Sequence, residues 1–326
     1  MADVIPITGQ TDSLESCRAL TAAGRRCRNR ATGPDGYCGV HRRARRTPPA
    51  DDRLGDLLRF VRRRLTGEYR VDEFGFDPEL TEEILAPIGR FFHERWWRVD
   101  WLGLENVPSE GGALLVANHA GTVPWDAVML QFGVLDRHPA HRHVRLLAAD
   151  LAFSFPWIGA LARKSGSTLA CAEDAYRLLD KGEVLGVFPE GFKGVGKGFR
   201  QRYKLQRFGR GGFIEIALRA RVPIVPVSIV GSEEIYPMIH DARTVARLFG
   251  FPYFPITLFF PWLGPLGLIP LPSKWIVEFG EPILTDDVSD DAWQDPITVF
   301  EMTDRVREEI QQTLYRNLMA RRSVFY

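Results

Sequence analysis

Short apolar runs alternate with segments of helical periodicity from about residue 99 to the end of the chain. The runs predict buried strands at residues 113–117, 145–149, 184–188, 222–229 and 275–279. Apolar positions at helical spacing predict helices at residues 172–179, 211–220 and about 298–318. This alternation predicts an α/β domain over residues 99–326, with a mixed, mostly parallel sheet flanked by helices.

Residues 51–98 predict two amphipathic helices ahead of this domain. The first has a basic and an apolar face, formed by Arg59, Arg62, Arg63, Arg64, Leu54, Leu57, Leu58, Val61 and Leu65. The second begins at the capping pair Asp77 and Pro78, and Pro87 predicts a kink within it. Its apolar stripe consists of Leu80, Ile84, Leu85, Ile88, Phe91, Phe92 and Trp96. Such stripes either pack on the core or rest at a bilayer interface.

Charge is distributed unevenly along the chain, although the formal net charge is only +1. Nine arginines and a single acid, Asp35, lie between Cys17 and Ala50. This stretch closes with the sequence Thr-Pro-Pro, which is typical of a stiff linker, so residues 1–50 are predicted to be a separate basic module. The first residues lack the charged and apolar segments of a secretory signal, which predicts a cytosolic chain.

Three of the four cysteines lie in this basic module, and disulfides are rare in the cytosol. Three thiolates and one imidazole form a closed tetrahedral site for structural zinc, with the ligands Cys17, Cys27, Cys38 and His41. Zinc would supply folding free energy that so short a segment cannot gain from its own core. Three unrelated thiols are the alternative. The arginines are expected to bind nucleic acid, anionic lipid headgroups or a carrier protein.

A histidine with a nearby carboxylate follows the first predicted strand of the domain. His119 lies in a loop that contains Gly121 and Pro124, and Asp126 comes at the end of that loop. Such a carboxylate orients an imidazole and stabilises its protonated form, as a general base requires. The pair is either a catalytic base or an ordinary local hydrogen bond.

A glycine-rich, basic loop follows the strand predicted at residues 184–188. The loop starts with Pro-Glu-Gly, and its glycines let the backbone approach a ligand closely. Positive charge for an anionic group comes from Lys193, Lys197 and Arg200. The alternative is a surface turn with solvated charges.

Together these segments resemble the glycerolipid acyltransferase superfamily, which contains the lysophosphatidate and glycerol-phosphate acyltransferases. The family's Asn-His motif with a downstream Asp is matched by Asn118, His119 and Asp126. Its Phe-Pro-Glu-Gly motif is intact at residues 188–191, and its proline-bearing apolar run is matched at residues 222–227. The resemblance extends over about residues 100–285, and three motifs in the family's order are more specific than any one alone.

This resemblance implies an O-acyltransferase that uses acyl-CoA or an acylated carrier protein as donor and a glycerolipid hydroxyl as acceptor. His119 would accept the hydroxyl proton, and Asp126 would hold the ring and offset its charge. The acceptor would be bound by Asn118, Glu190, Gly191, Lys193 and Arg200. Because such substrates lie in the bilayer, a peripheral, monotopic protein on the cytoplasmic face of the cell membrane is expected.

Two departures from the family pattern affect the predicted acceptor. Six residues separate His119 from Asp126 where the family has four, so Asp126 has to reach back through a longer loop. The arginine that contacts the acceptor phosphate in the family's second motif is absent from residues 166–173. With residues 203–213, these departures resemble the branch that contains neutral-glyceride acyltransferases. The acceptor is therefore either of the lysophosphatidate type or a mono- or diacylglycerol.

Residues 251–271 are apolar over about the length of a membrane-spanning helix. Six prolines between Pro252 and Pro272 exclude an uninterrupted helix, because proline lacks the backbone N–H. The segment is expected either to cover an acyl-chain tunnel or to dip into the membrane interface.

A second class of function is a non-catalytic lipid- or nucleic-acid-binding protein on a degraded acyltransferase scaffold. The longer loop before Asp126 favours this class. The intact motifs at residues 118–119 and 188–191 favour the enzyme, since binding alone requires neither.

Overall fold

The computed structural model describes residues 53–154 and 156–325, and the chain divides into two compact units, residues 1–68 and 69–326. The described part of the first unit contains helix α2 (Arg53–Thr66), where the first amphipathic helix is expected. The proposed zinc ligands Cys17, Cys27, Cys38 and His41 lie outside the described residues.

The second unit is built on a seven-stranded sheet in the order β1-β9-β6-β2-β5-β3-β4. The strands are β1 (Asp100–Leu102), β2 (Ala113–Ala117), β3 (Val144–Ala148), β4 (Thr168–Leu169), β5 (Val184–Val187), β6 (Ile224–Val230) and β9 (Ile276–Phe279). β2 pairs in parallel with β5 and β6, and β3 in parallel with β4 and β5. β9 is antiparallel to β6 and parallel to β1. The predicted mixed, mostly parallel sheet is confirmed.

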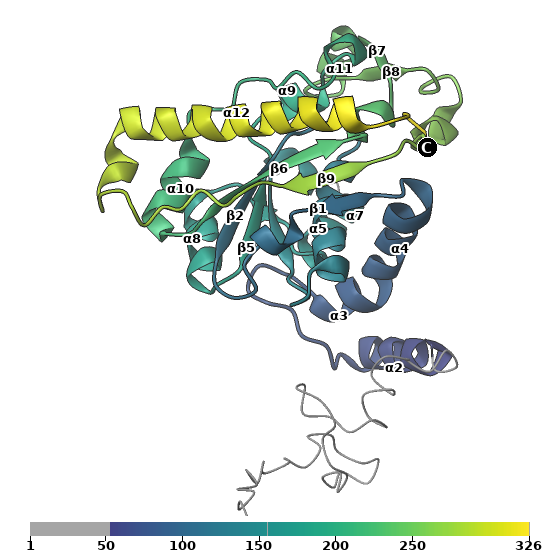
Figure 1. Ribbon diagram of the computed structural model, residues 1–326. Helices are drawn as coiled ribbons and strands as arrows, with labels where there is room; N and C mark the ends of the chain where they lie inside the picture. The colour runs from purple at the N-terminus through teal and green to yellow at the C-terminus, as the bar shows by residue number, and fades with distance from the viewer. Residues whose placement is uncertain (1–52, 155, 326) are drawn as a thin grey trace, which may run out of the picture. The chain divides into compact units, whose positions relative to one another are not determined.

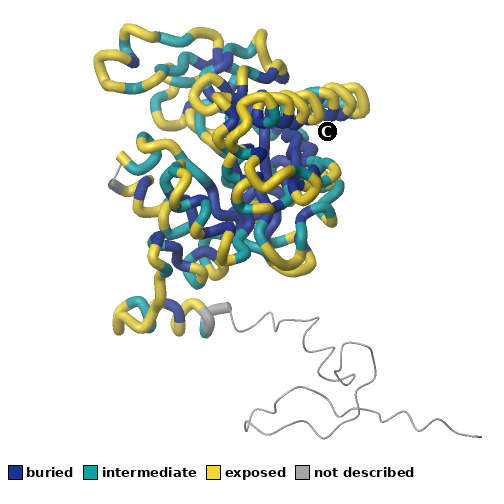
Figure 2. Tube along the Cα trace, turned by 90° about the vertical axis from the view of Figure 1, so that its left-hand side faces the viewer, coloured by how far each residue is buried: buried dark blue, intermediate teal, exposed yellow. Residues whose placement is uncertain are grey.

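Helices cover both faces of this sheet (Figure 1). One face carries α8 (Ala172–Asp180), α10 (Gly212–Ala220) and α12 (Pro296–Ala320). The other face carries α5 (Trp125–Arg137) and the end of the helical run from Pro78 to Trp96. Side chains of β2 alternate between the two layers, and every one of them is buried. Figure 2 shows buried residues gathered in the middle of the domain. This burial on both sides explains why the strands read as continuous apolar runs.

The second predicted amphipathic helix is present, but its type changes along its length. It consists of α3 (Pro78–Leu80), a π-helical turn (Thr81–Leu85), α4 (Ala86–Phe91) and a second π-helical turn (Phe92–Trp96). Asp77 caps it, because the Asp77 carboxylate accepts the Leu80 N–H at 3.0 Å. The first π-helical turn ends just before Pro87, where the helical hydrogen-bond ladder loses a donor.

The buried face of this helix differs from the expected apolar stripe. Ala86, Gly89 and His93 are buried, whereas Ile88 and Phe91 of the stripe are 53% and 52% exposed. Small residues face the neighbouring helix α5 because the two backbones approach closely there.

Smaller elements complete the unit. They are α6 (Asp150–Ser154), α7 (Pro156–Lys164), α9 (Phe192–Val195), α11 (Arg243–Leu248), β7 (Met238–Asp241), β8 (Pro255–Thr257) and the 3-10 turn Gly264–Leu268. β7 and β8 form a separate antiparallel pair. Within residues 53–325, apart from the gap at 155, every helix is too short or too polar to cross a bilayer.

Gly89 provides a test of the packing between α4 and α5. A β-carbon at Gly89 would come within 2.8 Å of the Phe132 Cβ, an atom that side-chain rotation cannot move away. Gly89→Ala is therefore expected to lower the free energy of unfolding by about 1–3 kcal/mol, despite the better helix propensity of alanine. Chemical denaturation measures this. The control is Gly212→Ala in α10, where a β-carbon meets no atom within 4 Å, and an equal loss in both variants contradicts the packing argument.

Candidate functional site

The predicted pair of His119 and Asp126 is formed. His119 follows the end of β2, and Asp126 lies in the first turn of α5. The His119 Nδ1 and the Asp126 Oδ2 are 2.8 Å apart. Because a carboxylate only accepts, the shared proton belongs on Nδ1, and Nε2 keeps the lone pair that a general base needs.

Backbone donors hold the Asp126 carboxylate in one orientation. Its Oδ2 also accepts the Ala120 N–H at 2.7 Å, and its Oδ1 accepts the Ala127 N–H at 2.8 Å. The side chain is fully buried at the N-terminus of α5, where the helix dipole favours negative charge. The longer loop therefore still closes on His119.

Tyr253 lies in the apolar segment, residues 251–271, and supports the longer loop between His119 and Asp126. Its hydroxyl donates to the Thr122 carbonyl at 2.8 Å. Burial, with smaller contributions from the charges of Asp126 and Asp241, raises the pKa of Tyr253 to about 12. The hydroxyl is thus a proton donor at any physiological pH. This contact could not be predicted from the sequence, because the two residues are far apart in the chain.

Asn118 connects two neighbouring strands at the edge where the site lies. Its Nδ2 donates to the Ile229 carbonyl at 3.0 Å, and its Oδ1 accepts the Ile229 N–H at 2.7 Å. The side chain is fully buried between β2 and β6. The acceptor-binding role expected for Asn118 stays a prediction, and its amide is occupied by the backbone.

The Phe-Pro-Glu-Gly loop lies against the His119 backbone. The Glu190 Oε1 accepts the His119 N–H at 2.9 Å, and the Glu190 Oε2 accepts the Gln206 N–H at 2.6 Å. A β-carbon on Gly194 would lie 2.7 Å from the His119 carbonyl oxygen, so only glycine allows this approach. The Phe188 and His119 rings are 4.6 Å apart between centroids. The two sequence motifs therefore meet at His119.

The basic residues of this loop divide into two groups. Lys193 in α9 and Arg200 in the 3-10 turn Phe199–Gln201 are exposed, as is Gly191, and their acceptor-binding roles stay predictions. Lys193 neighbours Gly194 and so lies at the rim of the site. Lys197 is buried, and its Nζ lies 3.0 Å from Glu233 and 3.3 Å from Glu190. The prediction that Lys197 offers free charge to an anion was wrong, because two carboxylates surround its ammonium.

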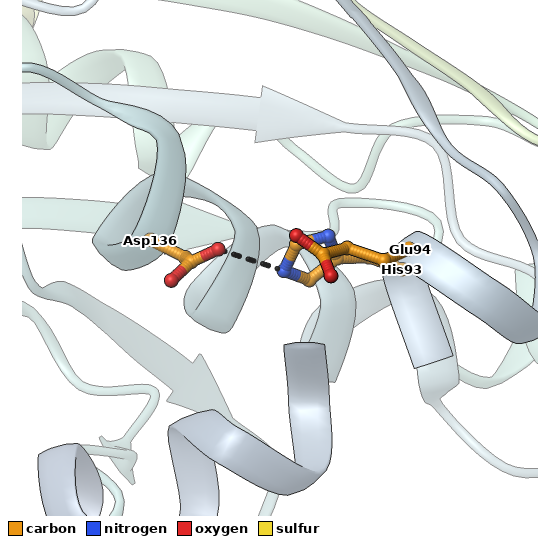
Figure 3. Close-up of side chains that lie close together, drawn as sticks. All are labelled: His93, Glu94 and Asp136. Carbon is orange, nitrogen blue, oxygen red and sulfur yellow. Dashed lines mark ion pairs between the residues drawn. The ribbon is translucent and has the colours of Figure 1, made fainter. Parts of the chain in front are cut away.

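A second group of polar side chains lies on the α5 face of the sheet (Figure 3). His93, Glu94 and Asp136 have ligand atoms within 4.8 Å of one another, which is the spacing of a metal site. Arg90 pairs with Asp136, and Arg137 Nη2 lies 2.7 Å from Glu94. Burial lowers the pKa of His93, so its ring is neutral. The arginines already occupy the carboxylates that a cation would need, which makes this group an ion-pair network.

Comparisons with known proteins give one family match and several similar proteins. The model of the family described as Acyltransferase matches residues 98–230. An uncharacterised protein of Mycobacterium tuberculosis is 60% identical over 267 residues, which is 82% of this chain and 75% of that protein. A DGAT1/2-independent enzyme synthesizing storage lipids from Bos taurus is 24% identical over 216 residues, 66% of this chain and 59% of that enzyme. The crystal structure of the lysophosphatidate acyltransferase PlsC from Thermotoga maritima aligns with a TM-score of 0.49 at 20% identity, over 76% of this chain and 84% of that one.

Replacing Asn118 tests whether it holds the site together. Asn118→Ala leaves the Ile229 N–H and carbonyl buried without partners, which is expected to lower the free energy of unfolding by about 2 kcal/mol. Denaturant unfolding measures the loss, and amide exchange is expected to become faster at Ile229. Unchanged stability and exchange would show that the amide is free for a ligand.

Proposed function

This chain belongs to the acyltransferase family, and we propose that it transfers a fatty acyl group from a thioester to a hydroxyl of a glycerolipid. The observation that carries the proposal is the 2.8 Å contact between His119 Nδ1 and the buried Asp126, beside the Glu190 loop. This arrangement leaves one imidazole nitrogen free to take a proton.

The proposed reaction follows from that geometry. His119 Nε2 accepts the proton of the acceptor hydroxyl while the oxygen attacks the thioester carbonyl. Asp126 stabilises the imidazolium that forms, and the proton then passes to the leaving thiolate as the carbon–sulfur bond breaks. One ester and one thiol result, so the proton and the acyl group are balanced.

The donor is proposed to be acyl-CoA or an acylated carrier protein, with Lys193 and Arg200 available for its phosphates or for an acceptor phosphate. A mono- or diacylglycerol acceptor is favoured over a lysophosphatidate. The family arginine is absent from residues 166–173, and the buried Lys197 is already compensated by two carboxylates. The storage-lipid enzyme of Bos taurus is consistent with a neutral acceptor.

The longer loop was the main reason to consider a non-catalytic protein. The longer loop no longer favours a non-catalytic protein, because Asp126 reaches His119 at hydrogen-bond distance. For residues 1–50 we retain the proposal of a zinc-folded basic module on Cys17, Cys27, Cys38 and His41 that binds anionic headgroups or a carrier protein, with nucleic acid as the less favoured partner.

We further propose that the protein rests on the cytoplasmic face of the membrane through the apolar segment. Trp262 is 70% exposed and Leu266 is 66% exposed, with further exposed apolar side chains at Leu258, Leu263, Leu268 and Ile269. The Trp96 Nε1 donates to the Pro270 carbonyl at 3.0 Å, and the Trp96 ring lies 6.4 Å between centroids from the ring of the exposed Phe91 of α4. Exposed Trp and Leu favour the membrane interface.

Catalysis is tested with acyl-CoA and a panel of lysophosphatidate, monoacylglycerol and diacylglycerol acceptors, by measuring release of free CoA. His119→Ala and Asp126→Asn are each expected to lower kcat by about 10²–10⁴, because the proton acceptor is lost or misoriented. Unchanged CoA release by His119→Ala, or no turnover of the wild type with any acceptor, would falsify the proposed function.

Membrane binding is tested by sedimentation with vesicles of phosphatidylcholine and phosphatidylglycerol. The double variant Trp262→Ser and Leu266→Ser is expected to weaken vesicle binding by about tenfold, because two apolar side chains no longer enter the interface. Phe300→Ser is the control, since Phe300 is 58% exposed in the N-terminal part of α12. Equal weakening in the control would argue against docking through the apolar segment.

A further inference from the structure

Lys197 is buried between two carboxylates directly behind the catalytic loop. The Lys197 side chain is 3% exposed, and the side chains of Glu190 and Glu233 are 0% and 4% exposed. The ammonium lies 3.0 Å from the Glu233 Oε1 and 3.3 Å from the Glu190 Oε2. One buried cation therefore faces two buried acids.

The contact with Glu190 links this cluster to the reaction centre. Glu190 uses both oxygens as acceptors, Oε1 for the His119 N–H and Oε2 for the Gln206 N–H. A protonated carboxyl carries hydrogen on one oxygen, which then faces a donor instead of accepting from it. Both contacts at full strength therefore require the ionised form of Glu190.

Glu233 shows how the cluster balances its charge. Burial raises the pKa of Glu233 to about 7, although Lys197 and the Tyr203 N–H act in the opposite direction. The Glu190 charge also raises the pKa of Glu233, and the Tyr203 hydroxyl is a further titratable group whose pKa responds to the Glu233 charge. Near neutral pH, Glu233 can take a proton, so that the Lys197 ammonium compensates the charge of Glu190 alone.

We propose that Lys197 is a positioning residue for His119, which acts by keeping Glu190 ionised and thereby fixing the His119 backbone. This role rests on the proposed acyl transfer. Stability alone explains the cluster poorly, because a buried ion pair loses much of its Coulomb attraction to desolvation. An apolar side chain of similar length would fill the same space without that cost, but it would leave Glu190 without its cation.

The pH profile of kcat/KM tests this role with Lys197→Met and Glu233→Gln. In Lys197→Met the buried Glu190 carboxylate loses its cation, so the acidic limb of the profile is expected to move to higher pH. Activity at pH 7 falls by about tenfold and recovers at alkaline pH. In Glu233→Gln the Lys197 ammonium compensates the charge of Glu190 alone. The acidic limb of the profile is therefore expected to stay at the same pH or to move to lower pH. An unmoved limb in Lys197→Met, or an upward shift in Glu233→Gln, overturns the proposal.

The matched control is Lys181→Met, because Lys181 also pairs with a glutamate, Glu73, but at the exposed surface of the domain. Exposed pairs contribute little, so its profile is expected to match the wild type. If Lys197→Met does not fold, Glu233→Gln carries the test, and an upward shift of its acidic limb overturns the proposal.

A second readout needs no substrate and separates this inference from the proposed function. Amide exchange at His119 and Gln206 is expected to become faster in Lys197→Met than in the wild type at pH 7, while exchange at Ile229 stays the same. Faster exchange together with no acyl transfer by the wild type would refute the function and keep the contact network. Unchanged exchange at His119 and Gln206 would refute the role of Lys197.

Discussion

Parallel pairing of β2 with β5 and β6 determines where the polar groups of the site lie. In parallel strands the carboxyl ends meet at one edge of the sheet, so the residues that follow them become neighbours. His119 follows β2, Glu190 follows β5, and Glu233 follows β6. Three segments that are distant in sequence thus supply His119, the acid that accepts its backbone N–H, and the acid that shares the Lys197 ammonium.

Beyond the carboxyl ends of these strands, buried side chains form hydrogen bonds with backbone N–H and carbonyl groups. Asn118 satisfies both polar groups of Ile229, Glu190 accepts the His119 N–H, and Asp126 accepts from Ala120 and Ala127. Each of these side chains is buried, so each hydrogen bond replaces one that water would otherwise make. The residues that resemble a binding set in the sequence are therefore largely the ones that shape the loop around His119. Lys193 and Arg200 are exposed, and their contacts with a substrate stay predictions.

The sequence predicts five of the seven strands of the sheet, but not the short β1 and β4, and it reveals few of the contacts between strands. Residues 113–117 were predicted as a strand and form β2, because side chains buried on both faces give a continuous apolar run. Helix α5 was not predicted, because residues 129–135 are buried on almost every side and show no polar face. The pairing of His119 with Asp126 was predicted from local spacing. The partners of Lys197 were not, because charge in a sequence does not reveal which acids the fold brings to it.

The apolar segment shows how a loop can serve both the site and a surface. Tyr253 turns inward and donates to the Thr122 carbonyl within the longer loop, whereas Trp262 and Leu266 turn outward. This hydrogen bond links the loop between His119 and Asp126 to the segment that we propose to meet the membrane. Contact of residues 251–271 with lipid would bring a lipid acceptor close to the loop between His119 and Asp126.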